Sequence, residues 1–254
     1  MTAIPYKYAY AQATGLGHRE TDQVCQDAFR LSIVDGRDGT PWIIAVVADG
    51  VGSAEHAEMG SQLAAEFFDR TMKVSLGVGL TNDLKLDLLA AVVMARFYIQ
   101  LVAEAKGHEL DAYGTTLLGL VTNGVKTGVV QIGDGAIVGG AGADWKLLIE
   151  PRRAEHINEN TFLTCPTWGE ALQCRIIKDP LDTAVLMSDG FEDVVISHAG
   201  PHAGFFGFVH AALAGKETPG RDAALCERLD QLLDGPSVRS RTHDDTTVIA
   251  IQTR

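Results

Sequence analysis

The chain has 254 residues, of which 46% are hydrophobic, and it carries a formal net charge of -12. This length allows one large domain or two small ones, and the hydrophobic fraction is sufficient for a substantial core. The acidic balance argues against nucleic acid and anionic membrane as partners. The four cysteines are widely spaced and include no C-x-x-C pair, a pattern typical of reduced thiols in a cytoplasmic protein.

The first residues show neither a basic region nor an apolar core, so we predict no secretory signal. By inspection, no apolar run approaches the length of a membrane-spanning helix. No repeat and no long polar linker divides the chain. We therefore predict a single domain over residues 1–254, located in the cytoplasm and without membrane contact.

Short apolar runs separated by Gly and Asp turns predict a series of strands. In chain order these are Tyr6–Ala13, Ala28–Val34, Trp42–Ala48, Thr115–Thr122, Lys126–Ile132, Ala136–Gly140, Trp145–Glu150, Gln173–Ile177, Thr183–Met187 and Thr246–Gln252. Apolar residues at helical spacing predict helices over Glu55–Val74, Asp83–Ala105, Gly204–Ala214 and Arg221–Leu233. This order predicts an α+β fold, an antiparallel β-sandwich with helices on its faces.

The two longest predicted helices each carry an apolar face that we expect to pack on a sheet. In the first, the face contains Met59, Leu63, Phe67 and Met72. In the second, it contains Leu84, Leu88, Val92, Ala95, Ile99 and Val102. Asn82 or Thr81 is the expected N-cap of the second helix.

Asp-Gly follows a predicted strand at Asp49-Gly50, Asp134-Gly135 and Asp189-Gly190, and Asp244-Asp245 comes directly before the last strand. A single Asp-Gly is best explained as a turn. Several carboxylates at strand ends, however, repel one another and are costly to desolvate, and a divalent cation relieves both problems. Because no Cys/His cluster accompanies them, we predict an all-oxygen site for magnesium or manganese.

Six motifs along the chain resemble those of one known family. In order they are CQDAF, VVADGVGS, YGTTLLGLV, VQIGDG, VLMSDGFEDVV and HDDTTVIAI, within Gly15 to Ile251. With these motifs the chain resembles the metal-dependent protein serine/threonine phosphatases of type 2C, the PPM family, and particularly their compact bacterial members. Each motif is weak alone, but six in the family's order are a strong signal. The resemblance implies a β-sandwich flanked by helix pairs, with a metal site at one end.

The resemblance also implies roles for individual residues. Asp49 would bridge two metal ions, and the carbonyl of Gly50 would bind one of them. Asp189 and Asp244 would complete the ligands of the other ion. Asp27 would hold metal-bound water, which makes it catalytic together with Asp49.

Three further carboxylates match supporting positions of the family. Asp134 and Asp193 correspond to positions linked to a third, weaker metal ion, and whether such an ion binds is left open. Asp245 takes a place often held by Asn, so we expect it to support the site rather than to form it.

The chemistry fits this assignment without a side-chain nucleophile. Two ions about 4 Å apart can share a bridging hydroxide and lower its pKa toward neutrality. The hydroxide attacks phosphorus in line while the metals offset charge on the phosphoryl oxygens. Together with this chemistry, the resemblance implies hydrolysis of phosphoserine and phosphothreonine in proteins, including the target of a cognate Ser/Thr kinase. We also expect the enzyme to be a monomer.

The chain departs from the family pattern in two ways that bear on catalysis. Val51 stands where many eukaryotic members have a His that is proposed to protonate the leaving group. Another donor or metal-bound water must then do that work. His18 is a candidate donor, and a histidine in a surface loop is an equally good interpretation of this residue. Arg19 is the candidate for the family's phosphate-binding Arg, although its spacing to Asp27 is long and a solvated surface Arg is the slightly favoured alternative.

The segment from Glu150 to Pro180 also departs from the family pattern and would form a flap over the site. Its Asn160, Thr161 and Thr164 either contact substrate or cap turns, and turns are the better interpretation. Two alternative functions remain at the level of sequence: a non-catalytic regulatory module with the same fold, and a phosphatase for a small phosphoester. The intact acidic residues argue against the first of these.

Overall fold

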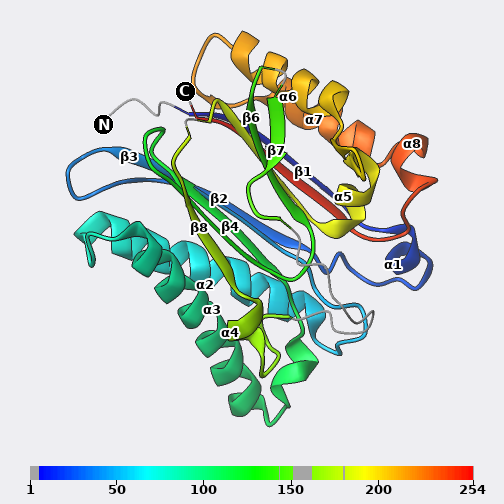
Figure 1. Ribbon diagram of the computed structural model, residues 1–254. Coiled ribbons are helices and arrows are strands. Elements are labelled where there is room, and N and C mark those ends of the chain that lie inside the picture. Colours follow the sequence, from blue (N-terminus) through cyan, green and yellow to red (C-terminus); the bar gives the residue numbers. More distant parts are fainter. Residues whose placement is uncertain (1–5, 143, 151–161, 180, 254) are drawn as a thin grey trace.

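Two β-sheets packed face to face form the centre of the fold, and a helix layer covers each outer face (Figure 1). The computed structural model describes residues 6–142, 144–150, 162–179 and 181–253. One sheet has the order β2 (Ala28–Asp35), β3 (Pro41–Ala48), β4 (Leu117–Thr122), β5 (Thr127–Ile132) and β8 (Gln173–Ile177). All pairs in this sheet are antiparallel.

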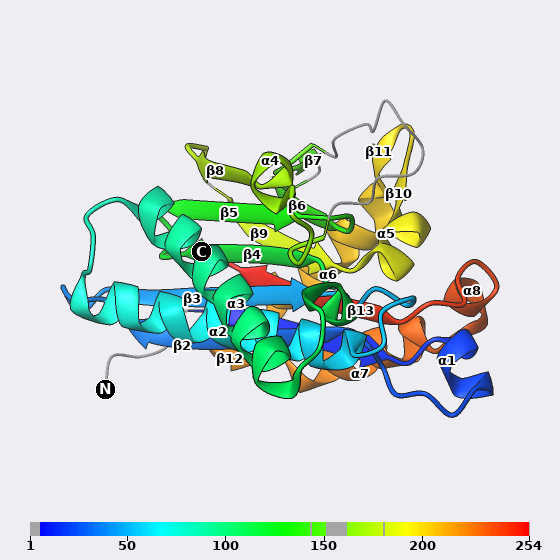
Figure 2. The same ribbon diagram turned by 90° about the horizontal axis from the view of Figure 1, so that it is seen from below.

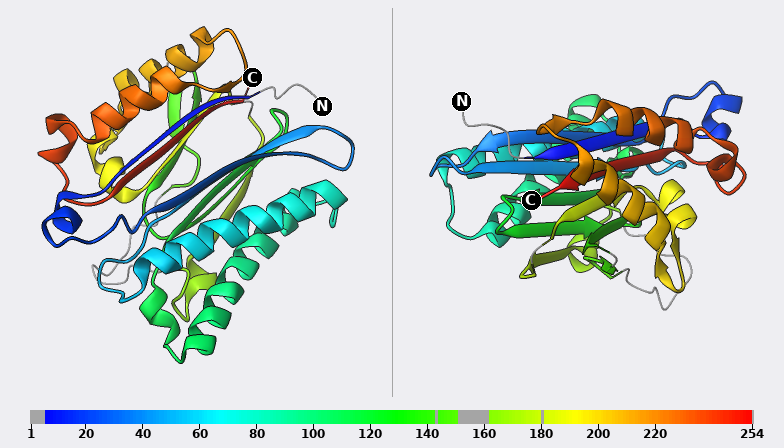
Figure 3. Two further views of the ribbon diagram at one scale, coloured as in Figure 1. Left: turned by 180° about the vertical axis from the view of Figure 1, so that it is seen from behind. Right: turned by 90° about the horizontal axis from the view of Figure 1, so that it is seen from above.

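The other sheet brings together strands that lie far apart in the sequence. Its order is β12 (Gly220–Arg221), β1 (Lys7–Ala13), β13 (Thr246–Gln252), β9 (Thr183–Met187), β6 (Ala136–Ala141) and β7 (Asp144–Leu147). The first and last long strands, β1 and β13, are antiparallel neighbours along their full length (Figure 3). Both ends of the domain are thereby held in one sheet.

The long helices pair on opposite faces of the sandwich, as Figure 2 also shows. On one face lie α2 (Ala57–Val78) and α3 (Leu84–Lys106), and on the other lie α6 (Ala203–Gly215) and α7 (Ala223–Leu233). The shorter elements are α1 (Leu16–Glu20), the 3-10 helix η1 (Leu110–Tyr113), α4 (Trp168–Ala171), α5 (Asp189–Val195), α8 (Pro236–Arg239) and the hairpin β10 (Ile196–Ser197) and β11 (Gly200–Pro201). The predicted α+β sandwich with flanking helix pairs is confirmed.

Strand β3 shows why the central strands read as unbroken apolar runs. Its odd-numbered residues, such as Ile43 and Val47, pack in the layer between the sheets, whereas Ile44 and Val46 pack against α2 and α3. Because both faces of the strand are buried, alternation of polar and apolar residues is absent. The predicted strands are confirmed, with differences of a few residues at their ends.

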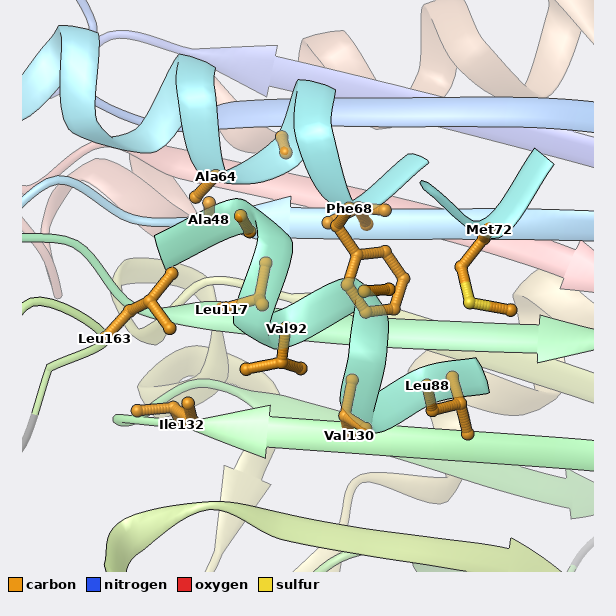
Figure 4. Packing of buried hydrophobic residues seen from close by; sticks show 14 of the residues in the cluster. Ala48, Ala64, Phe68, Met72, Leu88, Val92, Leu117, Val130, Ile132 and Leu163 are labelled. Atoms are coloured by element: carbon orange, nitrogen blue, oxygen red, sulfur yellow. The ribbon is translucent and has the colours of Figure 1, made fainter. Parts of the chain in front are cut away.

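The predicted packing face of α2 is confirmed at Met72, and at Leu63 and Phe67, which are partly buried against the core, but it is wrong at Met59. Met59 is 39% exposed, and the buried face is built largely from small residues together with Phe68 and Met72 (Figure 4). A Cβ on Gly60 would lie 2.3 Å from the carbonyl oxygen of Tyr113, so the helix approaches its neighbour too closely for a side chain there. A search for large apolar residues overlooks such a face, because close packing here selects small ones.

The apolar face predicted for α3 is confirmed, but its predicted N-cap is wrong. Leu88, Val92 and Ile99 are buried against the sheet. The cap is Asp83, whose carboxylate accepts a hydrogen bond from the Lys85 N–H at 2.9 Å, while Thr81 accepts from the Asp83 N–H. Asp83 satisfies a free N–H of the first turn, as N-cap carboxylates commonly do.

By length and composition alone, α3 is apolar enough to cross a membrane, so the expectation that no run reaches that length is wrong. Core helices pass the same test, and α3 is packed on β5 and β8 as well as on α2. One face of α3, which includes Leu88, Val92 and Ile99, therefore belongs to the core. Four other large apolar side chains of the helix are about half exposed, namely Leu86, Val93, Phe97 and Leu101.

Candidate metal centre and active site

The acidic residues at the strand ends gather at one end of the sandwich. Asp49 follows β3, Asp134 lies between β5 and β6, and Asp189 begins α5 directly after β9. Asp244 precedes β13, which runs antiparallel to β9, so its start lies beside the end of β9. The predicted convergence of these carboxylates is therefore seen in the structure.

Asp49 occupies the most unfavourable position for a negative charge. Burial raises the pKa of its carboxyl well above the ordinary value, and the charges of Asp27 and Asp189 raise it further. Its main chain is fully engaged, because the Asp49 N–H donates to Thr116 Oγ1 at 2.9 Å and its carbonyl accepts from the Thr116 N–H at 2.8 Å. The backbone is held in place while the carboxylate is left available for a cation.

Asp27 is buried beside Asp49 and has one unpartnered oxygen. Its Oδ2 accepts hydrogen bonds from Ser188 Oγ at 2.8 Å and Thr247 Oγ1 at 2.6 Å. Its Oδ1 is buried without a partner among the described residues. Burial raises the pKa of Asp27 to about 7, and the two hydroxyls only partly oppose this shift. An orphaned carboxylate oxygen of this kind fits a ligand that the structure does not contain, either water or a cation.

Asp189 and Asp244 reach the site from two main-chain segments in close contact. A Cβ on Gly190 would lie 2.2 Å from the Asp245 carbonyl oxygen, so only glycine allows α5 to begin this near β13. Loss of hydration raises the pKa of Asp244, and the negative charge of Asp189 raises it further.

Gly50 has a similar steric requirement. A Cβ there would lie 2.8 Å from the Gln26 carbonyl oxygen and 2.9 Å from Ala57, so a side chain would push the segments apart. The Gly50 N–H donates to the Gln26 carbonyl at 3.2 Å. Glycine thus lets the Asp49 segment pack closely against Gln26 and Ala57, while the role of the Gly50 carbonyl as a metal ligand stays a prediction.

Asp245 is buried and acts as a structural support. Its Oδ1 accepts from the Gly15 N–H at 2.6 Å, and its Oδ2 accepts from the Gln26 N–H at 2.6 Å and from His18 Nδ1 at 2.9 Å. Ligand atoms of His18, Asp244 and Asp245 lie within 4.8 Å of one another. Because three donors already use the oxygens of Asp245, this trio is a poorer cation site than the carboxylates around Asp49.

The two basic candidates differ in their surroundings. His18 lies on α1 with 15% of its side chain exposed, held by Asp245, so it is not a histidine of a solvated loop. Arg19 forms an ion pair with Asp234 at 2.7 Å, and both side chains are about half exposed. Its role in phosphate binding stays a prediction.

Near Asp134 and Asp193 lies one acidic residue that the sequence analysis missed, Glu192. Burial raises the pKa of Asp134, and the charge of Asp189 adds to this. Burial raises the pKa of Glu192 to about 7, and the charges of Asp193 and Asp134 raise it further. Glu192 directly precedes Asp193 in the motif VLMSDGFEDVV, so its position along α5 was the available signal.

The donor set as a whole fits divalent metal ions. It offers carboxylates that cannot all ionise without a compensating charge, with Asp27 buried and Asp49 partly buried, and an orphaned oxygen on Asp27. Of the flap residues, Asn160 and Thr161 lie outside the described residues, and Thr164 is buried, which does not favour contact with substrate.

A model of the family described as protein phosphatase 2C matches residues 14–234. The chain belongs to this family. It is a metal-dependent serine/threonine protein phosphatase, as the motif order predicted. The phosphatase is similar to "Serine/threonine-protein phosphatase 3" of Escherichia coli (strain K12), with 29% identity over 249 residues that cover 96% of this chain and 97% of that protein.

Solved structures show the same fold. A bacterial serine phosphatase matches with a TM-score of 0.67 and 14% identity, over 97% of each chain. The catalytic domain of the serine threonine protein phosphatase PstP, in complex with two manganese ions, matches with a TM-score of 0.65 and 21% identity, again over 97% of each chain. The phosphatase fold assigned to this chain is thus shared along nearly its full length.

Proposed function

We propose that the phosphatase is a single domain that uses two divalent ions, magnesium or manganese. Asp49, Asp189, Asp244 and the carbonyl of Gly50 are the proposed ligands. The observation that carries this proposal is the buried position of Asp49 among other carboxylates, which raises its pKa well above the ordinary value. An oxygen-rich, strongly acidic site of this kind prefers hard cations. The two manganese ions of the similar PstP catalytic domain support the number.

When bound, the ions supply the activation of the attacking water and neutralise charge on the phosphoryl oxygens. The protein's own residues supply orientation. Asp27 Oδ1 is proposed to accept a hydrogen bond from the attacking water, because Ser188 and Thr247 hold its other oxygen and so fix the plane of the carboxylate. Asp49 is proposed to bridge both ions, since its main chain is held by Thr116, directly before β4.

His18 is the proposed proton donor to the leaving serine or threonine oxygen. Its Nδ1 lies 2.9 Å from Asp245 Oδ2, which fixes the ring and leaves Nε2 to deliver the proton. Arg19 is proposed to bind the substrate phosphate, sharing its guanidinium with Asp234. Asp134 and Asp193 are proposed to serve a third, weaker ion, with Asp27 and Asp245 as supporting groups.

The substrates are phosphorylated proteins, and we propose that they include the target of a cognate Ser/Thr kinase. We further propose that the enzyme acts as a monomer in the cytoplasm and engages neither nucleic acid nor membranes. The net charge of -12 supports the proposal that nucleic acids and membranes are not partners, because polyanionic partners would be repelled.

The deciding experiment measures phosphate release from a phosphothreonine peptide with manganese, with magnesium and with a chelator. We expect release with either metal and none with the chelator, and restoration when metal is added back in excess. Release that persists after complete chelation would contradict the metal assignment. A small phosphoester assayed in parallel tests the alternative substrate class.

A further inference from the structure

A buried arginine lies directly behind the Asp244 segment. Arg239 is the last residue of α8, and only 7% of its side chain is exposed. Its Nη2 donates to the Thr14 carbonyl at 3.0 Å, and its Nη1 donates to the Asp244 carbonyl at 3.2 Å. One guanidinium therefore joins the end of β1 to the start of β13.

The position of these carbonyls explains why a guanidinium is needed. The last paired residues of β1 and β13 are Ala13 and Thr246, so Thr14 and Asp244 lie just beyond the ladder of backbone hydrogen bonds. Main-chain carbonyls beyond a ladder still require donors when they are not in water. The planar guanidinium presents several N–H groups in a rigid fork and can serve both carbonyls at once, which an ammonium group cannot do in the same way.

The peptide between Asp244 and Asp245 is held from both sides. Its carbonyl oxygen accepts from Arg239, while its N–H donates to the carboxylate Oδ1 of Asp244 itself at 2.8 Å. Gly15 packs against the same peptide, since a Cβ there would lie 2.4 Å from the Asp244 carbonyl carbon. Because the Asp244 carboxylate is tied to the plane of this peptide, the arginine that fixes the plane also fixes the carboxylate.

Asp234 connects this arrangement to α1. Its Oδ1 lies 3.6 Å from Arg239 Nε and 2.7 Å from Arg19 Nη2. In Figures 1 and 2, α1 and α8 accordingly lie side by side at the same end of the molecule. Arg239 thus forms an ion pair with Asp234 at the end of α7, while its hydrogen bonds among the described residues go to the two carbonyls.

We propose that Arg239 is a positioning residue for Asp244. It contacts neither substrate nor metal and acts by holding the Asp244–Asp245 peptide in the orientation that directs the Asp244 carboxylate into the metal site. The inference rests on the proposed role of Asp244 as a metal ligand. Removal of a group that orients a metal ligand commonly lowers metal affinity by about 10-fold to 100-fold.

The test compares Arg239→Met and Arg239→Lys with the wild type by calorimetric titration of manganese into chelator-treated protein. We expect Arg239→Met to weaken the affected manganese site by about tenfold or more. Arg239→Lys should fall between the two, because it keeps the charge but loses the fork. Phosphate release by both variants should recover at high manganese, so the manganese concentration for half-maximal activity rises more than kcat falls.

Two matched controls separate positioning from stability. Arg228→Met removes an exposed arginine from α7 and should leave manganese binding unchanged. Val238→Ala removes apolar contacts of the residue beside Arg239, which is fully buried in the core cluster under α7. Val238→Ala should lower the midpoint temperature of unfolding. It should not weaken manganese binding when binding is measured at a temperature well below that midpoint.

The outcomes are distinct. If Arg239→Met and Arg239→Lys bind manganese as tightly as the wild type, Arg239 only stabilises the fold and the inference is wrong. If Val238→Ala weakens manganese binding as much as Arg239→Met does, the loss comes from a general loosening of the segment between α7 and β13, and the inference is also wrong. If the wild type neither binds manganese nor releases phosphate, the proposed function itself is wrong. The wild-type protein alone gives that result, so it is distinguishable from a failure of the inference about Arg239.

Discussion

The same dipeptide stands at both ends of strand β3 with opposite consequences. Before the strand, Asp38-Gly39 forms an exposed turn, in which Asp38 accepts a hydrogen bond from the Thr40 N–H at 3.0 Å. That hydrogen bond lowers the pKa of Asp38. After the strand, burial raises the pKa of Asp49. The comparison shows that the chemistry of an Asp-Gly pair is decided by what surrounds the strand end and not by the pair itself.

Substitution of Asp49 is expected to have the largest effect on activity. Asp49→Asn should reduce phosphate release to background, because it removes the proposed bridging ligand. The metal-free variant should stay folded and be at least as stable as the wild type, since carboxylate repulsion is relieved. Asp38→Asn is the matched control and should keep full activity. Turnover near the wild-type rate in Asp49→Asn would contradict the two-metal assignment.

When the metal ions are removed, repulsion among the carboxylates of the site should make the free energy of unfolding depend on pH. In the metal-free folded protein, burial raises the pKa of Asp27 to about 7, whereas the pKa of an Asp in the unfolded chain is about 4. The folded state therefore binds more protons than the unfolded state between these values, and the free energy of unfolding should fall as pH rises through this window. The raised pKa of Asp49 acts in the same direction.

Thermal melts of chelated protein from about pH 4 to pH 8 test this sign. The chelated protein should keep a cooperative transition throughout, because the three apolar core layers do not include the carboxylates. With saturating manganese the decline should disappear. A metal-free protein that becomes more stable with rising pH would show that the carboxylates are not strained by burial.

A smaller effect should separate two of the partly buried carboxylates, Asp134 and Asp189, from each other. Asp134→Ala should lower turnover while leaving binding of the two tight manganese ions nearly unchanged, because Asp134 is assigned only to the third ion. Asp189→Ala should lose tight binding. Calorimetric titration of both variants makes the comparison. If both lose the tight ions equally, Asp134 belongs to the central pair of sites.

The smallest effect is expected far from the carboxylates, at the start of α3. Asp83→Ala removes the N-cap bond to the Lys85 N–H and should lower the free energy of unfolding by about 1 kcal/mol. Urea unfolding and phosphate release measured on the same preparation test this. A loss of kcat in Asp83→Ala would show that the start of α3 is coupled to the carboxylate site.

Local patterns were sufficient to predict most of the fold. Buried strands such as β3 and β13 appear as apolar runs, and α3 appears as a helical apolar face, because periodicity depends on near neighbours in the chain. The face of α2 was predicted only in part: Met72 is buried as expected, but the close packing through Gly60 and other small residues was overlooked, because small residues give a weak hydrophobic signal.

The sequence by itself determined that acidic residues follow or precede buried strands, and the order of its motifs identified the family. Only the tertiary structure decided which of them are strained or supported. The hydroxyls that hold Asp27 lie 161 and 220 residues away along the chain, on Ser188 and Thr247. Arg239 reaches Thr14 across 225 residues. Such contacts arise where antiparallel strands from distant segments end side by side, and no local pattern encodes which donors will meet there.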